Sequence, residues 1–334
     1  MRTLLSRMPL RGLARWALAL TLVAVACRDL PQAPSPSRPE ADLVVAPPPC
    51  GIVTTNTNLS GDCTGPLVVG ASGITVNLGG HAVTCGPVPN PIDGLAGIGI
   101  FGQTNDHVTN GEVKNCELGI QIISGGSHEL SNLNVHNNGR IGIEFDAGSN
   151  NAVRNTISSF NGSGFPGIGV AVSQSAFNKL DQLQIEQNAF GIILAGGADN
   201  NVVTSSFLLR NGVAGILIAG SNNTIDQSTK VTQSVVGILV HSSTGNTIRA
   251  TSSSQNAYGI DLGPGVTNTT IQSSDASNNS RVGIWLGIGA TSNLIMSNKA
   301  FGNGFLDLED DNLDCDANTW KSNQFSTANQ PCIS

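Results

Sequence analysis

Apolar and polar residues alternate in short stretches that begin with Gly-Ile and recur along most of the 334-residue chain. The stretches are GITV at 73, GIGI at 97, GIQI at 119, GIEF at 142, GIGV at 167, GIIL at 191, GILI at 215, GILV at 237, GIDL at 259, GIWL at 283 and FLDL at 305. Ten intervals span 232 residues, so the mean period is 23.2 residues. Alternation with period two is typical of strands, and a repeat of this length indicates a solenoid whose units stack on one another.

A second apolar stretch begins about eight residues after most Gly-Ile starts, and a third short one follows it. The second stretches are NNAV at 150, FNKL at 177, NNVV at 200, SNNTI at 221, GNTI at 245 and SNLI at 292. Three short strands separated by turns form one coil of a parallel β-helix, in which coils stack at a spacing of ~4.8 Å. We therefore predict an all-β fold, a parallel β-helix of about eleven coils, with Ile216 and Ile218 inside and Leu217 outside.

Asparagine precedes many of the Gly-Ile starts, at Asn115, Asn138, Asn188, Asn211, Asn256 and Asn279. Asparagine tolerates the left-handed turn conformation, and stacked asparagines can hydrogen-bond from coil to coil, so we predict a structural role. A leucine-rich repeat would need helical segments, but the corresponding segment QSTKVTQSVV at 227–236 is strand-like. The composition, with 12% charged residues and 40 glycines, also favours strands and tight turns.

Residues 1–26 are predicted to be a signal peptide, because four arginines precede the apolar stretch 16–26. Cleavage would follow Ala26, or Cys27 in LVAVAC would become the lipidated first residue of a lipoprotein. Residues 27–49 are predicted to be a Pro-rich tether and residues 50–334 the β-helix domain. Removal of the leader leaves 12 basic and 23 acidic residues, a net charge of −11, which gives no electrostatic reason to bind nucleic acid. The protein is thus expected to be extracytoplasmic, secreted or held at a bacterial membrane only through a lipid on Cys27.

Six cysteines follow Cys27, and an even number in an exported chain predicts disulfides. Proximity in the sequence suggests Cys50–Cys63 and Cys315–Cys332. Cys85 and Cys116 end equivalent third strands of successive coils, which places them within disulfide reach.

The tandem G-I-x-[ILV] … N-x-[IV] coils resemble the right-handed parallel β-helix proteins of the pectate-lyase-like superfamily. Within it, they are similar to exported bacterial β-helix repeat proteins, including the periplasmic accessory type linked to nitrous oxide reductase. Residues 50–86 and 315–332 resemble the end caps of that group. The resemblance implies a single-stranded, right-handed helix with disulfide-bonded end caps over residues 50–334. It implies little about activity, because this scaffold carries lyases, epimerases, glycosidases, adhesins and surface proteins.

The residues three positions after the restart asparagines are Arg154, Asp181, Thr204, Asp226 and Arg249, and all but Thr204 are charged. The coil spacing predicts the pairs Arg154–Asp181 and Asp226–Arg249. Asp181, Asp226 and Arg249 are the candidate catalytic residues of a lyase, epimerase or hydrolase, whereas exposed ion pairs are the structural alternative. The carboxylate trio of the calcium-dependent lyases and the Asp-Pro-His-Asp signature of alginate epimerases are absent from the sequence.

The residues that point outward from the Gly-Ile strands form a predicted outer column: Gln121, Glu144, Gly169, Ile193, Leu217, Leu239, Asp261, Trp285 and Asp307. An apolar middle is unusual for a solvated sheet face, so a loop covers it or a ligand binds there. Trp285 between Asp261 and Asp307 would suit a sugar ring. We therefore predict polysaccharide-binding residues Glu144, Leu217, Leu239, Asp261, Trp285 and Asp307, the alternative being a Trp285 packed under a neighbouring loop.

No sequence motif predicts a metal site. The accessory-protein resemblance suggests copper for His81, His107, His128, His136 and His241, but too few of them meet, so solvated side chains are expected. The acidic segment 307–316 offers Asp310, Asp311 and Asp314 to calcium without the spacing of an EF-hand, and a solvated cap loop is expected instead.

The leading functional hypothesis is a secreted or lipid-anchored surface protein that binds polysaccharide or another extended polymer without catalysis and without a cofactor, calcium being the alternative. A polysaccharide lyase, epimerase or hydrolase is the second hypothesis. A structural or adhesive protein is the third.

Overall fold

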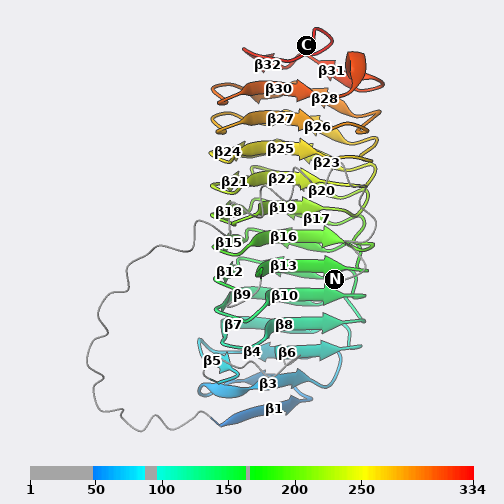
Figure 1. Ribbon diagram of the computed structural model, residues 1–334. Coiled ribbons are helices and arrows are strands. Elements are labelled where there is room, and N and C mark those ends of the chain that lie inside the picture. Colours follow the sequence, from blue (N-terminus) through cyan, green and yellow to red (C-terminus); the bar gives the residue numbers. More distant parts are fainter. Residues whose placement is uncertain (1–47, 87–95, 163–165) are drawn as a thin grey trace, which may run out of the picture. The chain divides into compact units, whose positions relative to one another are not determined.

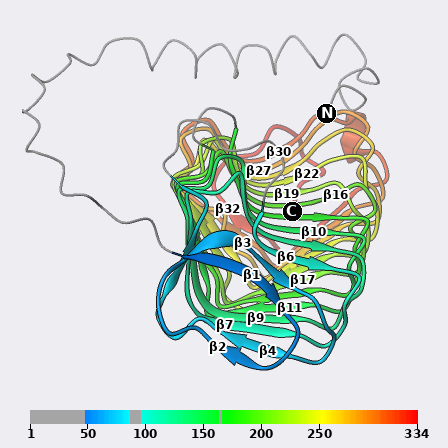
Figure 2. The same cartoon turned by 90° about the horizontal axis from the view of Figure 1, so that it is seen from below.

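A computed structural model describes residues 48–86, 96–162 and 166–334. These residues form parallel strands, and each strand pairs with the equivalent strand of the next coil, so that about eleven coils stack on one another (Figure 1). Viewed along the stack, the strands fall into three rows around an interior (Figure 2). The predicted β-helix is therefore confirmed. The predicted signal peptide and lipidated Cys27 lie outside the described residues, as does the tether apart from its last two residues.

The first row contains the Gly-Ile strands. Its members are β1 (Pro49–Val53), β3 (Cys63–Val69), β6 (Ala96–Phe101), β8 (Leu118–Ile123), β10 (Ile141–Asp146), β13 (Ile168–Ser173), β16 (Phe190–Ala195), β19 (Ala214–Ile218), β22 (Val236–Val240), β25 (Tyr258–Leu262), β27 (Val282–Leu286) and β30 (Leu306–Asp310). This row carries the predicted outer column.

The second and third rows contain shorter strands. The second comprises β2 (Thr57–Asn58), β4 (Thr75–Asn77), β7 (His107–Lys114), β9 (Glu129–His136), β11 (Ala152–Arg154), β14 (Lys179–Asp181), β17 (Val202–Thr204), β20 (Thr224–Asp226), β23 (Thr247–Arg249), β26 (Thr270–Gln272), β28 (Leu294–Met296) and β31 (Thr319–Lys321). The third comprises β5 (Ala82–Thr84), the ends of β7 and β9, β12 (Ile157–Ser159), β15 (Gln184–Glu186), β18 (Phe207–Leu209), β21 (Lys230–Thr232), β24 (Ser252–Ser254), β29 (Lys299–Ala300) and β32 (Gln324–Phe325). A short 3-10 helix, Leu313–Cys315, lies in the last coil.

Two of the predicted Gly-Ile starts are assigned incorrectly, and FLDL at 305 is shifted by two residues because Leu306 aligns with Val282. GITV at 73 contributes β4 to the second row, and Leu67 of β3 is the true partner of Ile98 in the first row. In the coil at 167, Ile168 aligns with Ile141, so Gly169 takes the place expected for Gly167. The sequence pattern could not settle these points, because strands of different rows begin with the same residue types and coil lengths vary.

The core lies between the three rows and consists of the inward residues of each strand. Ile216 and Ile218 are fully buried as predicted, and Leu217 on the outer side is half-buried. Burying each such side chain stabilises the fold by about 1.5–3 kcal/mol. Because every coil repeats the pattern, the core is continuous along the stack.

Two asparagine ladders join successive coils. The first ladder lies between the first and second rows. In it, the backbone N–H of an asparagine donates to the side-chain oxygen of the asparagine in the next coil, as from Asn151 to Asn178 and from Asn178 to Asn201, both at 2.9 Å. The second ladder, between the third and first rows, includes Asn138, Asn161, Asn188, Asn211, Asn256, Asn279 and Asn303. The predicted structural role is confirmed. Asn115 is an exception, because Cys116 holds that ladder position and Asn115 is a left-handed turn residue with φ 58°.

The N-terminal end of the first ladder replaces asparagine with a buried His–Asp pair. The His128 Nδ1 atom lies 3.2 Å from Asp106 Oδ2, and both side chains are fully buried. His128 was expected to be solvated, so that prediction is wrong. Its backbone N–H donates to Asn151 and its Nδ1 atom accepts from the backbone N–H of Asp106 at 3.3 Å, so the ring occupies a regular ladder position.

Replacing His128 with asparagine is expected to reduce acid sensitivity. Burial holds the pKa of His128 below its ordinary value of 6.5, so the folded state keeps the ring neutral while the unfolded state binds a proton. Stability therefore falls as the pH drops below about 6.5, and His128→Asn removes this contribution. Thermal unfolding midpoints at pH 7 and pH 5 test this, with exposed His107→Asn as the control. If the unfolding midpoint falls by the same amount between pH 7 and pH 5 in His128→Asn and in the unchanged protein, the prediction is contradicted.

The three predicted disulfides are present. Cys50–Cys63, Cys85–Cys116 and Cys315–Cys332 have Cα–Cα distances of 5.0, 4.8 and 6.1 Å. They join neighbouring coils near the start of the stack and close the loop at its end. Three disulfides indicate an extracytoplasmic protein. Among residues 48–86, 96–162 and 166–334, no helix has the length and apolar character to cross a membrane.

Candidate functional site

The register of the first row defines an outer column of side chains. In order along the stack it contains Gln121, Glu144, Ala171, Ile193, Leu217, Leu239, Asp261, Trp285 and Glu309. Ala171 stands where Gly169 was predicted. Glu309 stands where Asp307 was predicted, because Leu306 aligns with Val282 and Leu308 with Ile284. The remaining members of the predicted column are confirmed in position, and Glu144 accepts a hydrogen bond of 2.8 Å from Gln121.

Asp307 has a different task from the one predicted. It is buried, and its Oδ1 atom accepts hydrogen bonds from the backbone N–H and the Nδ2 of Asn303 at 3.2 and 2.9 Å. Oδ2 accepts from the backbone N–H groups of Ser326 and Thr327. These hydrogen bonds lower the pKa of Asp307 against the opposing effect of burial. Asp307 therefore terminates the second asparagine ladder and is unavailable to a ligand on the outer face.

The middle of the outer column is apolar. Leu239 is buried and packs in one cluster with Ala214 and Val236, with half-buried Leu217 and Phe190 against it. Ala214, Val236 and Phe190 each precede the glycine of a first-row strand, so a second apolar column runs beside the outer column. The outer face of the first row is thus a two-residue-wide apolar strip over the central coils.

Aromatic and charged residues replace this strip over β25, β27 and β30. The Tyr258 and Trp285 rings stack with centroids 5.5 Å apart. Arg281 Nη1 lies 3.2 Å from the Tyr258 hydroxyl oxygen, and Trp285 Nε1 donates to Asp311 Oδ2 at 3.2 Å. We call Tyr258, Asp261, Arg281, Trp285, Glu309 and Asp311 the aromatic–carboxylate cluster.

Asp261 lies between Leu239 and Trp285 in the outer column. It is 2% exposed, and its Oδ1 atom has no hydrogen-bond partner in the part of the chain that the structure describes. Burial, together with the negative charges of Asp311 and Glu309, raises the pKa of Asp261 to about 8. At neutral pH this side chain is therefore mostly a neutral carboxyl group, able to donate one hydrogen bond as well as accept.

Sequence reasoning found Asp261 and Trp285, named Asp311 only as a calcium candidate, and missed Tyr258, Arg281 and Glu309. A signal was available for Tyr258, since it is the single tyrosine of the chain and it directly precedes a Gly-Ile start. Arg281 and Asp311 lie in turns, where the repeat pattern carries no information about which side chains approach each other.

The candidate catalytic residues lie in the second row, away from the outer column. Arg249 pairs with Asp226 as predicted, with Nε 3.3 Å from Oδ1, and this hydrogen bond lowers the pKa of the Asp226 carboxyl. Asp181 accepts from the Thr204 hydroxyl at 2.7 Å. Arg154 is adjacent to Asp181 in register but pairs with Glu129 at 3.9 Å, so the predicted Arg154–Asp181 pair is wrong. These contacts fit ion pairs that link coils, and a catalytic role for Asp181, Asp226 and Arg249 remains a hypothesis.

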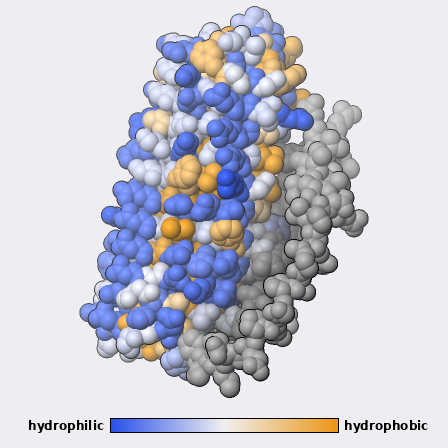
Figure 3. Space-filling view, turned by 90° about the vertical axis from the view of Figure 1, so that its left-hand side faces the viewer, coloured by the Kyte–Doolittle hydropathy of each residue, from blue (hydrophilic) through white to orange (hydrophobic). Residues whose placement is uncertain are grey.

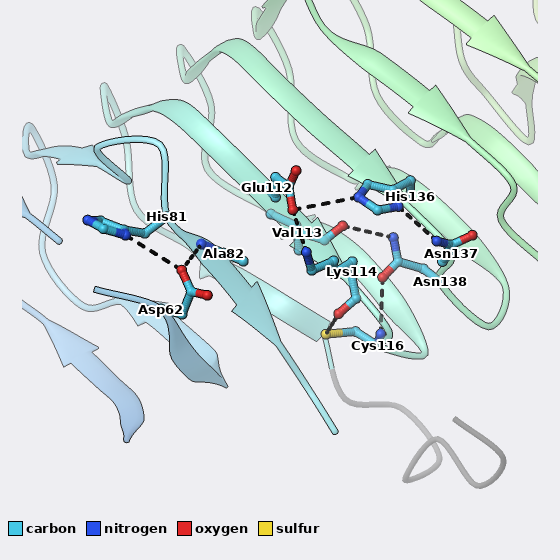
Figure 4. Close-up of polar contacts among 10 residues, drawn as sticks. All are labelled: Asp62, His81, Ala82, Glu112, Val113, Lys114, Cys116, His136, Asn137 and Asn138. Atoms are coloured by element: carbon cyan, nitrogen blue, oxygen red, sulfur yellow. Dashed lines mark hydrogen bonds and ion pairs between the residues drawn. The ribbon is translucent and has the colours of Figure 1, made fainter. Parts of the chain in front are cut away.

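His81 and His136 form separate small contacts in the early coils (Figure 4). His81 Nδ1 lies 3.5 Å from Asp62. Glu112 contacts Lys114 Nζ at 2.5 Å and His136 Nε2 at 3.8 Å, and the Lys114 hydrogen bond lowers the Glu112 pKa. His107 is exposed beside Glu129, as expected for a solvated histidine, whereas burial lowers the pKa of both His136 and His241.

The calcium candidates do not form a common site. Asp310 is fully buried and accepts hydrogen bonds from its own cap, including Trp320 Nε1 at 2.9 Å. Asp311 binds the Trp285 indole, and Asp314 is exposed in the 3-10 helix. The prediction of a solvated cap loop is thus wrong for Asp310. In the described ranges, no three His, Cys, Asp or Glu side chains are arranged to hold a metal ion.

The side of the third row is mostly hydrophilic, with apolar residues in its middle coils (Figure 3). Phe160 is 50% exposed there, and Lys230 lies 5.8 Å from the centroid of the half-buried Phe207 ring. Among the described residues, the stacked aromatic pair lies on the first row and not on this side.

Comparisons with known proteins agree with this geometry. The model of the family described as periplasmic copper-binding protein (NosD) matches residues 154–330, and that of the right-handed β-helix region matches residues 53–208. No curated protein matches the chain.

Solved structures share the fold at low sequence identity. The A-module of one Azotobacter vinelandii mannuronan C-5 epimerase matches with 16% identity and a TM-score of 0.64, covering 84% of this chain and 80% of its own. The A-module of a second epimerase from the same organism matches with 13% identity and a TM-score of 0.62, covering 86% of this chain and 84% of its own. The catalytic domain of a GH87 α-1,3-glucanase in complex with nigerose matches with 15% identity and a TM-score of 0.53, covering 87% of this chain and 71% of its own. These likenesses confirm a right-handed parallel β-helix.

The described residues do not fit a copper centre. Copper sites use clustered imidazole, thiolate or thioether groups. The six cysteines of the described ranges are all in disulfides, their only methionine is Met296, and their histidines are dispersed over separate contacts.

Proposed function

Because the chain belongs to the family of periplasmic copper-binding proteins (NosD), we propose that it acts outside the cytoplasm. We also infer that it binds a polysaccharide along its outer column. The polymer would lie along the first row and be held at the aromatic–carboxylate cluster. Secretion or a lipid anchor on Cys27 is part of the same proposal.

The observation that carries the proposal is the stacked pair of Tyr258 and Trp285 beside carboxyl groups. Aromatic rings offer an apolar platform to the C–H face of a sugar, and carboxylates accept hydrogen bonds from its hydroxyl groups. Trp285 is half-buried and fixed through its Nε1 by Asp311, so the platform is held in place before a ligand arrives.

The repeat geometry favours a polymer over a small ligand. The outer column presents one side chain per coil at intervals of ~4.8 Å, so a long chain could contact several coils at once. The similar β-helix structures include a mannuronan C-5 epimerase and an α-1,3-glucanase, but at this identity the likeness gives the fold alone, and the aromatic–carboxylate cluster supports the proposal. A lyase, epimerase or hydrolase and an adhesive protein are compatible with the same scaffold.

Replacement of Trp285 by alanine is expected to weaken glycan binding at least about tenfold, since it removes the larger ring of the platform. The test is affinity electrophoresis of the full chain against neutral glycans and polyuronates, with and without calcium. Phe207→Ala, an aromatic change on the third row, serves as the control and should bind like the unchanged protein. Failure to retain any glycan, or equal retention of Trp285→Ala, would overturn the proposal. Release of new reducing ends or unsaturated products would favour the enzymatic alternative.

A further inference from the structure

We propose that the aromatic–carboxylate cluster selects uncharged glycan units and discriminates against uronate units. This inference rests on the polysaccharide-binding function proposed above and adds the substrate class. It stands on the arrangement of three carboxyl groups and one unpartnered buried oxygen around the Trp285 ring.

The charge of the cluster is the first argument. The carboxyls of Asp311 and Glu309 are close enough to Asp261 to raise its pKa. Arg281 is the cation of the cluster, and it lies on the Tyr258 side, with its guanidinium 5.8 Å from that ring. A uronate ring on Trp285 would bring another carboxylate toward these acidic groups, and like charges at close range cost free energy. A neutral hexose would meet no such repulsion.

The hydrogen-bonding state of Asp261 is the second argument. Buried polar atoms are nearly always paired, yet Asp261 Oδ1 has no partner among the described residues. Its pKa of about 8 means that the group is mostly protonated at neutral pH. A protonated carboxyl donates and accepts, and a sugar hydroxyl does the same, so a hydroxyl is a matching partner. A uronate carboxylate can only accept, which matches the carboxylates of Asp311 and Glu309 poorly.

The support of Trp285 is the third argument. Its Nε1–H is already used by Asp311, so the indole offers a ligand its apolar face and no polar edge. Polar recognition then falls to the neighbouring carboxyls, which favour hydroxyl donors. The geometry therefore points to a ligand rich in hydroxyl groups and poor in negative charge.

The test compares binding of the full chain to a neutral glucan and to a polyuronate of matched length, by titration calorimetry at low and moderate salt. We expect the neutral glucan to bind at least tenfold more tightly. Asp261→Asn, which mimics the neutral carboxyl, should keep neutral binding within about twofold. Asp261→Leu should lose at least tenfold, and Asp311→Asn should raise polyuronate affinity at least fivefold by removing a negative charge.

The outcomes separate this inference from the proposed function. If the polyuronate binds as tightly as the glucan or more tightly, and Trp285→Ala abolishes that binding, polysaccharide binding stands and the selectivity inference falls. The inference also falls if Asp261→Asn loses as much affinity as Asp261→Leu. If neither polymer binds, the proposed function falls and takes the inference with it. The unfolding midpoint of each variant identifies any that fail to fold. If an Asp261 variant fails to fold, the polyuronate affinity of Asp311→Asn tests the inference by itself.

Discussion

Asp310→Ala is expected to lower the free energy of unfolding by about 4 kcal/mol, because it leaves two buried donors without an acceptor and removes two further hydrogen bonds. Asp310 is fully buried at the last coil. Its Oδ1 atom accepts from the backbone N–H and the Nδ2 of Asn312 at 3.0 and 2.8 Å. Its Oδ2 atom accepts from Trp320 Nε1 at 2.9 Å and from Asn318 Nδ2 at 3.3 Å. Alanine leaves the Asn312 backbone N–H and Trp320 Nε1 without this acceptor where water has little access, whereas the Nδ2 groups of Asn312 and Asn318 keep backbone carbonyl acceptors.

Urea unfolding measures this effect, with Asp314→Asn as the matched control in the same segment. Asp314 is exposed with φ 50°, a conformation that asparagine tolerates, so the control should unfold like the unchanged protein. Calcium should leave the unfolding midpoint of the unchanged protein where it is, because the Asp310 oxygens are occupied by the cap. If calcium stabilises the unchanged protein but not Asp310→Ala, these oxygens bind the ion, and the interpretation that the cap occupies them is wrong.

Gly191→Ala is the second change with a large expected effect, a loss of about 3 kcal/mol in unfolding free energy from overpacking. A Cβ atom at Gly191 would lie 2.4 Å from the carbonyl oxygen of Gly215 and 3.0 Å from Asn211 Nδ2. The first of these is backbone of the next coil, which can move only by opening the stack. The glycine of the Gly-Ile start is therefore required by the close approach of the next coil and of the asparagine ladder.

Gly212→Ala provides the control for this prediction. The nearest atom to a Cβ at Gly212 is 3.9 Å away, so alanine should be tolerated there. The two variants are compared by the midpoint of urea unfolding followed by circular dichroism. A Gly191→Ala midpoint equal to that of Gly212→Ala would show that the stack yields easily and would contradict the close-packing explanation.

The sequence allowed the fold to be predicted because its causes are local and repeated. A coil needs inward apolar residues such as Ile216 and Ile218, a small residue such as Gly191 and an asparagine such as Asn188, and these recur in most units. Stacking then follows, since no single coil can bury its own apolar side. The disulfide Cys85–Cys116 was predictable for the same reason, because equivalent positions of adjacent coils must be neighbours.

The candidate site was only partly predictable. Leu239, Asp261 and Trp285 follow from the repeat. Tyr258 and Asp311 do not, because their approach to Trp285 depends on side-chain directions in strands and turns of different coils. Glu309 was missed because a spacing of two residues in the last coil separates it from Asp307, and only the register shows which one faces outward.

The sequence by itself determined the coil, its period, its inward residues and its disulfides, since these depend on alternation and repetition along the chain. The tertiary structure alone decided which residues of successive coils lie side by side. Coil length is not constant along the stack, so a shift of two residues made Asp307 the end of a ladder and placed Glu309 beside Trp285. The same contacts buried His128 with Asp106 and left Asp261 Oδ1 without a partner in the described chain, because burial and electrostatics depend on the neighbours that stacking supplies.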